Sequence, residues 1–61
     1  MSPRLLTIAQ AAEELAVTER YIRHLIYRRR IQYVKLGRLV RIPQNAVDLM
    51  VLEGTVESEA L

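Results

Sequence analysis

The residues best suited to chemistry in this chain are its cations, and they are concentrated in one stretch. Eight of the nine Lys and Arg residues lie between Arg20 and Arg41, and no Asp or Glu interrupts that stretch. The formal net charge is only +2, so the segregation of the charges is more informative than their sum. Clustered cations bind phosphate oxygens and release the counterions condensed on a polyanion. The pattern predicts a cationic side of the molecule and favours nucleic acid as its partner.

The sequence has few residues suited to metal binding or catalysis. The chain has no cysteine, which excludes a disulfide, a thiolate nucleophile and a thiolate metal site. His24 is the single histidine, and no acidic side chain is expected on its helix face, so we expect no metal site. An enzyme needs a nucleophile, a base and a pocket, and the segregated acids provide no such cluster. We therefore expect no catalytic residue, no cofactor and no small-molecule ligand.

The apolar residues do not predict a membrane protein. No apolar run approaches the about 20 residues that a membrane span needs, and the first residues lack the apolar stretch of a secretory signal. A basic helix lying on an anionic membrane surface is an alternative, but the bulky residues Ile22, Leu25 and Ile26 are needed for a core. We expect a cytoplasmic protein with no membrane partner.

Two amphipathic helices are predicted in the first half of the chain. Thr7 is the expected N-cap of a helix over residues 8–16, and Gln10 completes a capping-box pattern. Thr18 is the expected N-cap of a second helix, which ends near Arg29. The connection between them is so short that the two helices must cross. For Thr7 the cap explains the residue fully, whereas Thr18 is also placed to contact a phosphate.

From Ile31 onward the apolar period changes to that of a hairpin. A two-residue loop, Gly37-Arg38, would mix polar and apolar groups on both faces, so we favour a three-residue loop over residues 37–39. This register assigns the strand residues to two faces, with Val34, Leu36, Val40 and Ile42 on one and Tyr33, Lys35 and Arg41 on the other. The pair Leu5 and Leu6 is consistent either with a third strand or with an ordered coil.

A third helix is predicted over residues 43–53, with Pro43 at its first position and Gly54 just past its end. Its apolar residues cover more of the circumference than one core contact requires. Some of that surface is expected to meet another molecule, and the candidates for self-association are Val47, Val51 and Leu52. Residues 1–54 form one domain, and residues 55–61 are expected to be an acidic, mobile tail.

These elements predict a mainly α fold with a small β-hairpin wing, a winged helix-turn-helix. The segments LLTIAQAAEEL, VTERYIRHLI, KLGRLVRI and IPQNAV, in this order and spacing, resemble the excisionase-type branch of the MerR-like winged helices. The resemblance covers about residues 5–52. One departure is Arg30, where the family often has the glycine that ends the helix, and a non-glycine residue there is costly in a left-handed conformation.

The resemblance implies a role as well as a fold. Small members of this family are phage excisionases, or recombination directionality factors, which bind repeated attachment sites, bend the DNA and steer a tyrosine integrase toward excision without covalent chemistry of their own. Regulators with this fold usually append an effector or dimerisation domain, for which this chain has no room. The expected partners are therefore double-stranded DNA, an integrase and neighbouring copies of the protein. A small transcriptional repressor and a protein-interaction module built on the third helix are alternatives.

In such a fold the second helix enters the major groove and flanking cations hold the backbone. Arg20 or Arg23 is expected to read guanine through paired hydrogen bonds, while Thr18 and Arg28 contact phosphates. Each tyrosine is as well explained by packing at the rim as by DNA contact. The expected recognition-helix contacts are Thr18, Arg20, Tyr21, Arg23, His24, Tyr27 and Arg28. The expected wing contacts, to the backbone or an adjacent minor groove, are Lys35, Gly37, Arg38 and Arg41.

Overall fold

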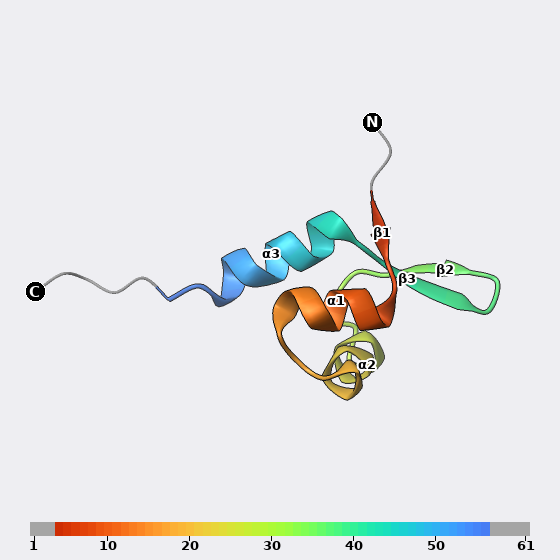
Figure 1. The fold of residues 1–61 in the computed structure, drawn as a ribbon, viewed down its shortest axis with the longest axis horizontal. Coiled ribbons are helices and arrows are strands. Elements are labelled where there is room, and N and C mark those ends of the chain that lie inside the picture. Colours follow the sequence, from red (N-terminus) through yellow and green to blue (C-terminus); the bar gives the residue numbers. More distant parts are fainter. Residues whose placement is uncertain (1–3, 57–61) are drawn as a thin grey trace, which may run out of the picture.

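The computed structural model describes residues 4–56, which form three helices and a three-stranded sheet (Figure 1). The expected winged helix-turn-helix is confirmed, because two crossing helices are followed by a hairpin and a third helix. Of the predicted tail, Thr55 and Val56 have no regular structure, and residues 57–61 lie outside the described part. In chain order the elements are β1 (Leu5–Leu6), α1 (Ile8–Leu15), α2 (Glu19–Tyr27), β2 (Val34–Leu36), β3 (Leu39–Pro43) and α3 (Gln44–Gly54).

The sheet is antiparallel and has the order β1-β3-β2. The two leucines whose structure the sequence left open form β1, in which Leu5 pairs with Pro43 and Leu6 with Ile42. Leu6 and Ile42 are both fully buried. The short strand therefore joins the amino-terminal segment to the centre of the fold.

The predicted hairpin register is wrong. Val34 pairs with Arg41, Lys35 with Val40 and Leu36 with Leu39, which leaves the two-residue turn Gly37-Arg38. Gly37 has a φ of 65° and Arg38 does not have a positive φ, the pattern of a type II′ turn, which suits the twist of a hairpin. The argument from faces fails because it requires one face of the hairpin to be buried. The hairpin instead extends away from the helices, so most of both faces meets solvent (Figure 1).

The first two helices end earlier than expected, each with a left-handed residue that is not glycine. Ala16 follows α1 with a φ of 55°, so the helix ends at Leu15 and not at residue 16. Arg29 has the same φ of 55°, so α2 ends at Tyr27. The strained position is thus Arg29 and not Arg30, the residue at which the family resemblance places the strain. Both ends carry the paired backbone bonds of a Schellman motif, in which Val17 donates to Ala12 and Arg30 donates to Leu25.

The third helix begins one residue later than predicted. Pro43 is not its first helical residue, because its ψ of 143° is extended and it still pairs with Leu5 in the sheet. Gly54 belongs to the helix, and Thr55 is its C-cap. The two other expected caps are confirmed, with Thr7 in a capping box with Gln10 and Thr18 accepting a hydrogen bond from the backbone of Tyr21.

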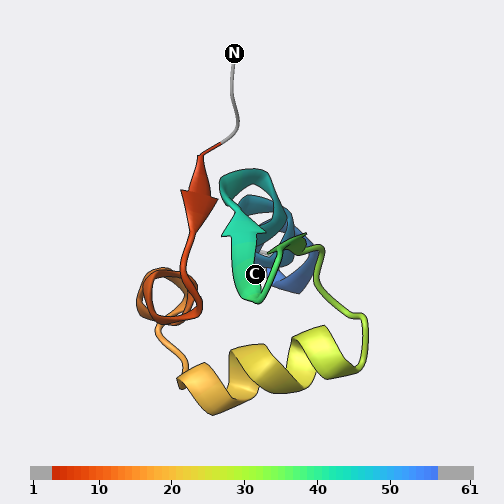
Figure 2. The same cartoon turned by 90° about the vertical axis from the view of Figure 1, so that its right-hand side faces the viewer.

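One core holds these elements together. α1 packs against α2, α3 and β3, and α2 lies across the face of the body opposite α3 (Figure 2). No polar or charged side chain of residues 4–56 is buried, so the core is purely apolar. Burial of its leucine, isoleucine and valine side chains contributes about 1.5–3 kcal/mol each. The buried residues are Leu6, Ala11, Ala12, Ile22, Leu25, Ile31, Ile42, Ala46 and Val47.

Candidate nucleic-acid interface

The orientation of α2 is fixed by its inward side chains. Ile22 is 0% exposed and Leu25 is 6% exposed, and Ile26 packs against the same cluster. A helix buried on this stripe must present its other positions to solvent. Thr18 fixes the start of the helix, because its Oγ1 accepts a hydrogen bond of 3.1 Å from the backbone N–H of Tyr21. The core and the N-cap therefore fix the position of the helix that carries the expected base contacts.

The outermost positions of α2 hold several of the expected contact residues. Arg20, Arg23 and Tyr27 are all exposed, and Tyr27 is 85% exposed, which leaves little of it for packing. Arg23 is held by an ion pair one turn back, with 3.4 Å between its guanidinium nitrogen and Oε1 of Glu19. Both side chains are half or more exposed, so water screens the pair and Arg23 can leave Glu19 for a ligand. Arg20 makes no side-chain hydrogen bond or ion pair to residues 4–56, so its guanidinium is available to a ligand.

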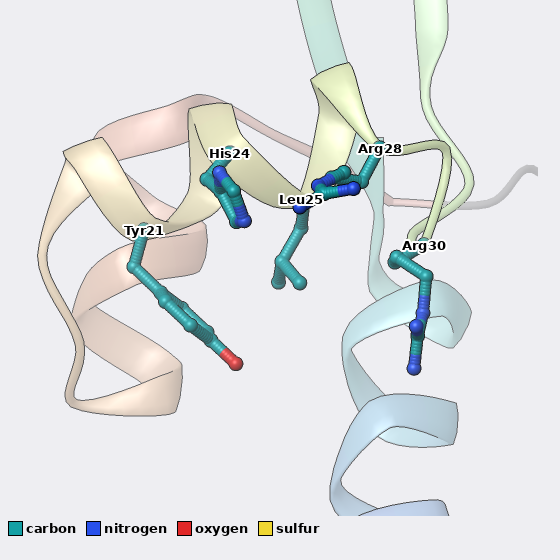
Figure 3. Close-up of a pocket in the computed structure, with 5 residues that line it drawn as sticks. All are labelled: Tyr21, His24, Leu25, Arg28 and Arg30. Atoms are coloured by element: carbon teal, nitrogen blue, oxygen red, sulfur yellow. The ribbon is translucent and has the colours of Figure 1, made fainter.

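A second group of expected residues lines one flank of the helix. Tyr21, His24 and Arg28 are three or four positions apart and border an open hollow of about 460 Å³ whose wall includes Leu25 (Figure 3). Arg30, from the loop after the helix, completes this hollow and points along α3 (Figure 3). A polar rim of one phenol, one imidazole and two guanidinium groups suits phosphate oxygens. The expected contacts did not include Arg30, because the sequence indicated this residue only as a replacement of the glycine that often ends the helix in the family.

The wing divides its cations between its two faces. Lys35 shares a face with Val40, whereas Arg41 shares the opposite face with Val34, which corrects the expected placement of Lys35 and Arg41 together. Arg41 is half-buried and donates a hydrogen bond of 2.9 Å from its guanidinium to the carbonyl of Val40. Arg38 is exposed at the turn. The wing can therefore present a cation at its tip and on either side.

Gly37 serves the turn. Its φ of 65° favours glycine, and a Cβ added there would meet no atom within 4 Å. The absence of a close neighbour means that the turn itself explains the residue.

A second cationic hollow lies at the base of the wing. Arg29 and Lys35 border a shallow depression of about 550 Å³ together with Tyr33 and Pro43. Arg29 was not among the expected contacts, although it belongs to the basic run that the sequence displays. It brings a cation from the end of α2 beside a cation of the wing.

The expected self-association surface is only partly exposed. Val47 is 2% exposed and belongs to the core, so it cannot meet another molecule without unfolding. Val51 and Leu52 are 54% and 72% exposed, as that role requires. Leu49, which is half-exposed, and Val56, which is almost fully exposed, extend the apolar surface beyond the residues predicted. The helical period could have indicated Leu49, three positions before Leu52.

Other kinds of site find little support in the described part. Among residues 4–56 no group of three or more His, Asp or Glu side chains could hold a metal ion. No helix in that part is long and apolar enough to cross a membrane. Glu13 and Glu14 lie beside Arg4 and Gln10, and Gln44 donates hydrogen bonds to Glu14 and Asp48, away from α2. Two other acids of the described part lie beside the cations, because Glu19 pairs with Arg23 and Glu53 lines a hollow with Arg30.

Comparison with known proteins agrees with this geometry. A family model described as a helix-turn-helix domain matches residues 5–55, which include every element of the fold. Neither the curated proteins nor the solved structures contain a match to the chain. Helix-turn-helix domains bind double-stranded DNA and are typical of non-enzymatic regulators. The match covers well over half of the chain, and the chain belongs to the helix-turn-helix domain family.

Proposed function

We propose that this protein is an excisionase, a recombination directionality factor that binds attachment-site DNA in several copies, bends it and directs a tyrosine integrase toward excision. The proposal starts from the DNA binding that the helix-turn-helix domain indicates. It is supported by the resemblance of residues 5–52 to the excisionase-type winged helices, which extends through the wing motif KLGRLVRI. Such a role places the protein on DNA in the cytoplasm of a bacterial host.

The observation that carries the proposal furthest is an apolar surface on an element that is not needed for DNA contact. Leu49, Val51 and Leu52 leave about half or more of their side chains in water at the carboxyl-terminal half of α3. Exposed apolar groups gathered on one element mark interaction sites. Contact between neighbouring copies through this surface would let them share the bending energy, which is on the order of 1–6 kcal/mol for a 20–30 base-pair site.

The geometry of α2 and the wing supports the following contacts for one copy. Arg20 and, once released from Glu19, Arg23 read guanine in the major groove, and Tyr27 packs against the groove wall beside them. Thr18, Tyr21, His24 and Arg28 hold the phosphates along the flank of the helix, with Arg30. Lys35, Arg38 and Arg41 hold the backbone or the minor groove on the far side, and Gly37 shapes the turn between them.

The experiment that tests the proposal combines the integrase and the host bending factor with paired attachment-site DNA, with and without this protein. Excision and integration are scored separately. We expect excision to rise and integration to fall, with no strand cleavage by the protein alone. Unchanged excision would refute the role. If a single bound copy represses a nearby promoter without bending the DNA, the protein is a transcriptional repressor instead.

A substitution on α3 tests whether neighbouring copies bind DNA cooperatively. Leu52→Glu places a charge on the apolar surface of α3, and we expect it to abolish cooperative filling of adjacent sites while leaving the affinity for a single site unchanged. Ala9→Glu adds the same charge at an exposed position of α1, so it is the matched control and should change neither property. If Leu52→Glu fills adjacent sites as cooperatively as the parent protein, α3 does not join the copies. Loss of binding to a partner protein, with DNA binding intact, would favour an interaction module.

A further inference from the structure

Two leucines lie at the outermost point of the wing, outside the core of the fold. In the observed register Leu36 is the cross-strand partner of Leu39, directly on either side of the turn Gly37-Arg38. Leu36 is 50% exposed and Leu39 is 54% exposed. The hairpin carries them away from the helices (Figure 1). Large apolar side chains gathered at the tip of a projecting hairpin are candidates for contact with another molecule.

The core does not explain the pair. On β3 the core-facing positions are Ile42, which is fully buried, and Val40, which packs against the core cluster. Side chains alternate between the faces of a strand, so Leu39 lies on the opposite face, together with Leu36. Neither leucine belongs to the cluster of buried or partly buried residues.

The charges around the pair point to an anionic occupant. Arg38 lies in the turn between the two leucines, Lys35 precedes Leu36, and Arg41 lies two positions beyond Leu39 on the same face. The wing contains no acidic residue. A second copy of the same wing would bring three like charges against three, which opposes wing-to-wing association. A duplex groove instead attracts the wing, because the phosphates along its rims can bind the cations and the stacked bases at its floor can contact the apolar groups.

The dimensions of the wing favour a distorted minor groove. Neighbouring strands are about 4.8 Å apart between their backbones, and the side chains of the tip add to that width. The minor groove of regular B-form DNA is only about 6 Å wide. Apolar side chains, leucine among them, enter minor grooves in other proteins by partly unstacking a base step, which opens the groove and kinks the duplex by roughly 20–90°.

We propose that Leu36 and Leu39 form an apolar wedge that enters the minor groove beside the major-groove contact of α2, partly unstacks one base step and kinks the duplex. Arg38 and Lys35 hold the phosphates on the rims of the opened groove. This inference rests on DNA binding by the domain and not on the excision role. It gives one copy of the protein its own means of bending DNA, independent of contact between copies.

The test uses the full chain and a duplex that the protein itself selects from a random library. 2-Aminopurine, whose fluorescence rises when it is unstacked, is placed in turn at each step of the groove that flanks the recognition-helix footprint, and the bend is measured by energy transfer between end labels. With one copy bound, we expect a rise at a single step and a kink. Leu36→Ala combined with Leu39→Ala should lose both signals and keep the footprint of α2.

Two further double variants serve as controls. One tests whether the kink depends on apolar volume at the wing tip, and the other tests whether a different apolar surface contributes to it. Leu36→Met with Leu39→Met keeps the apolar volume and should keep the kink. Leu49→Ala with Leu52→Ala also removes two leucine side chains, but from α3, and this variant should keep the kink as well. Circular dichroism of each variant checks that the domain stays folded, which the exposure of both leucine pairs favours.

Several results would overturn the inference. A wild-type complex with no fluorescence rise at any step would do so, as would a wing alanine variant that bends DNA as the parent protein does. A dimer in sedimentation without DNA that the wing alanine variant abolishes would identify a second copy as the occupant. Kinking by single copies without stimulated excision refutes the proposed function alone, whereas stimulated excision without a single-copy kink refutes the wedge alone.

Discussion

Arg29 offers a test in which stability and DNA binding should change in opposite directions. Its φ of 55° lowers the stability of the folded state by about 1–2 kcal/mol when the residue is not glycine. Glycine removes that strain but loses about 0.5–1 kcal/mol of additional backbone entropy on folding. We therefore expect Arg29→Gly to raise the free energy of unfolding by about 0.5–1 kcal/mol. In a domain of this size that corresponds to a rise in Tm of about 2–8 °C.

The same substitution removes a cation from the hollow at the base of the wing. Arg29 borders this hollow together with Lys35, and if it neutralises one phosphate its loss reduces the slope of log affinity against log salt by about 0.9. The loss should be similar on specific and random duplexes, since phosphates carry no sequence information. A more stable protein that binds every duplex more weakly is therefore the expected result.

Two matched variants in α1 separate the two effects. Ala16 has the same φ of 55° and the same pair of closing backbone bonds, but no charge, so Ala16→Gly should raise Tm equally and leave the salt slope unchanged. Ala9 is exposed within the helix, and Ala9→Gly should lower stability by about 0.5–1 kcal/mol. Thermal unfolding followed by circular dichroism measures all three. If Ala16→Gly and Ala9→Gly shift Tm in the same direction, the strain argument is refuted, and an unchanged salt slope for Arg29→Gly would remove Arg29 from the DNA contacts.

Three further predictions concern α2 and the wing. Glu19→Gln releases Arg23 and removes an anion beside the DNA, so duplex affinity should rise in a filter-binding titration, and an unchanged affinity would show that the ion pair does not restrain Arg23. Arg20→Ala should weaken binding to the selected site by about 1–3 kcal/mol and change binding to random duplex little, whereas Arg38→Ala should weaken binding to the two duplexes alike. If both variants lose the same binding free energy on both duplexes, the assigned roles are wrong. Thr18→Ala removes a helix cap and should destabilise the domain by about 0.5–2 kcal/mol in denaturant unfolding, and no change would mean that water replaces the hydroxyl.

The parts of the fold that the sequence predicts are those that local chemistry determines. Thr7, Gln10 and Thr18 cap the helices as expected because a cap is a contact between residues three positions apart, which the local sequence contains whatever the rest of the chain packs against. The stripe of Ile22, Leu25 and Ile26 also faces the core, because the helical period alone sets which residues share a face.

The parts that the sequence does not predict depend on what a segment packs against. The alternation in the hairpin misled because neither face of its outer half is buried, so nothing in the core selects the register and the turn decides it. Val47 looked like surplus apolar surface, but α3 packs on both α1 and β3 and needs it inside. The left-handed residues Ala16 and Arg29 escaped notice because the favourable residue for that conformation, glycine, is missing at both positions.

The register of the hairpin decides which apolar residues of the wing belong to the core. In the predicted register Leu39 lies within the loop, and Leu36 shares a face with Val40 and Ile42, as part of the core side of the wing. In the observed register Leu36 and Leu39 lie together on the opposite face, beside Arg41, and the core side of the hairpin ends at Val40. A one-residue change in loop length thus converts one apparent core residue, Leu36, and one loop residue, Leu39, into an exposed apolar pair beside several cations. Because the core needs neither leucine, the pair is free to contact another molecule, and the charges beside it favour the anionic groove of a duplex as that partner.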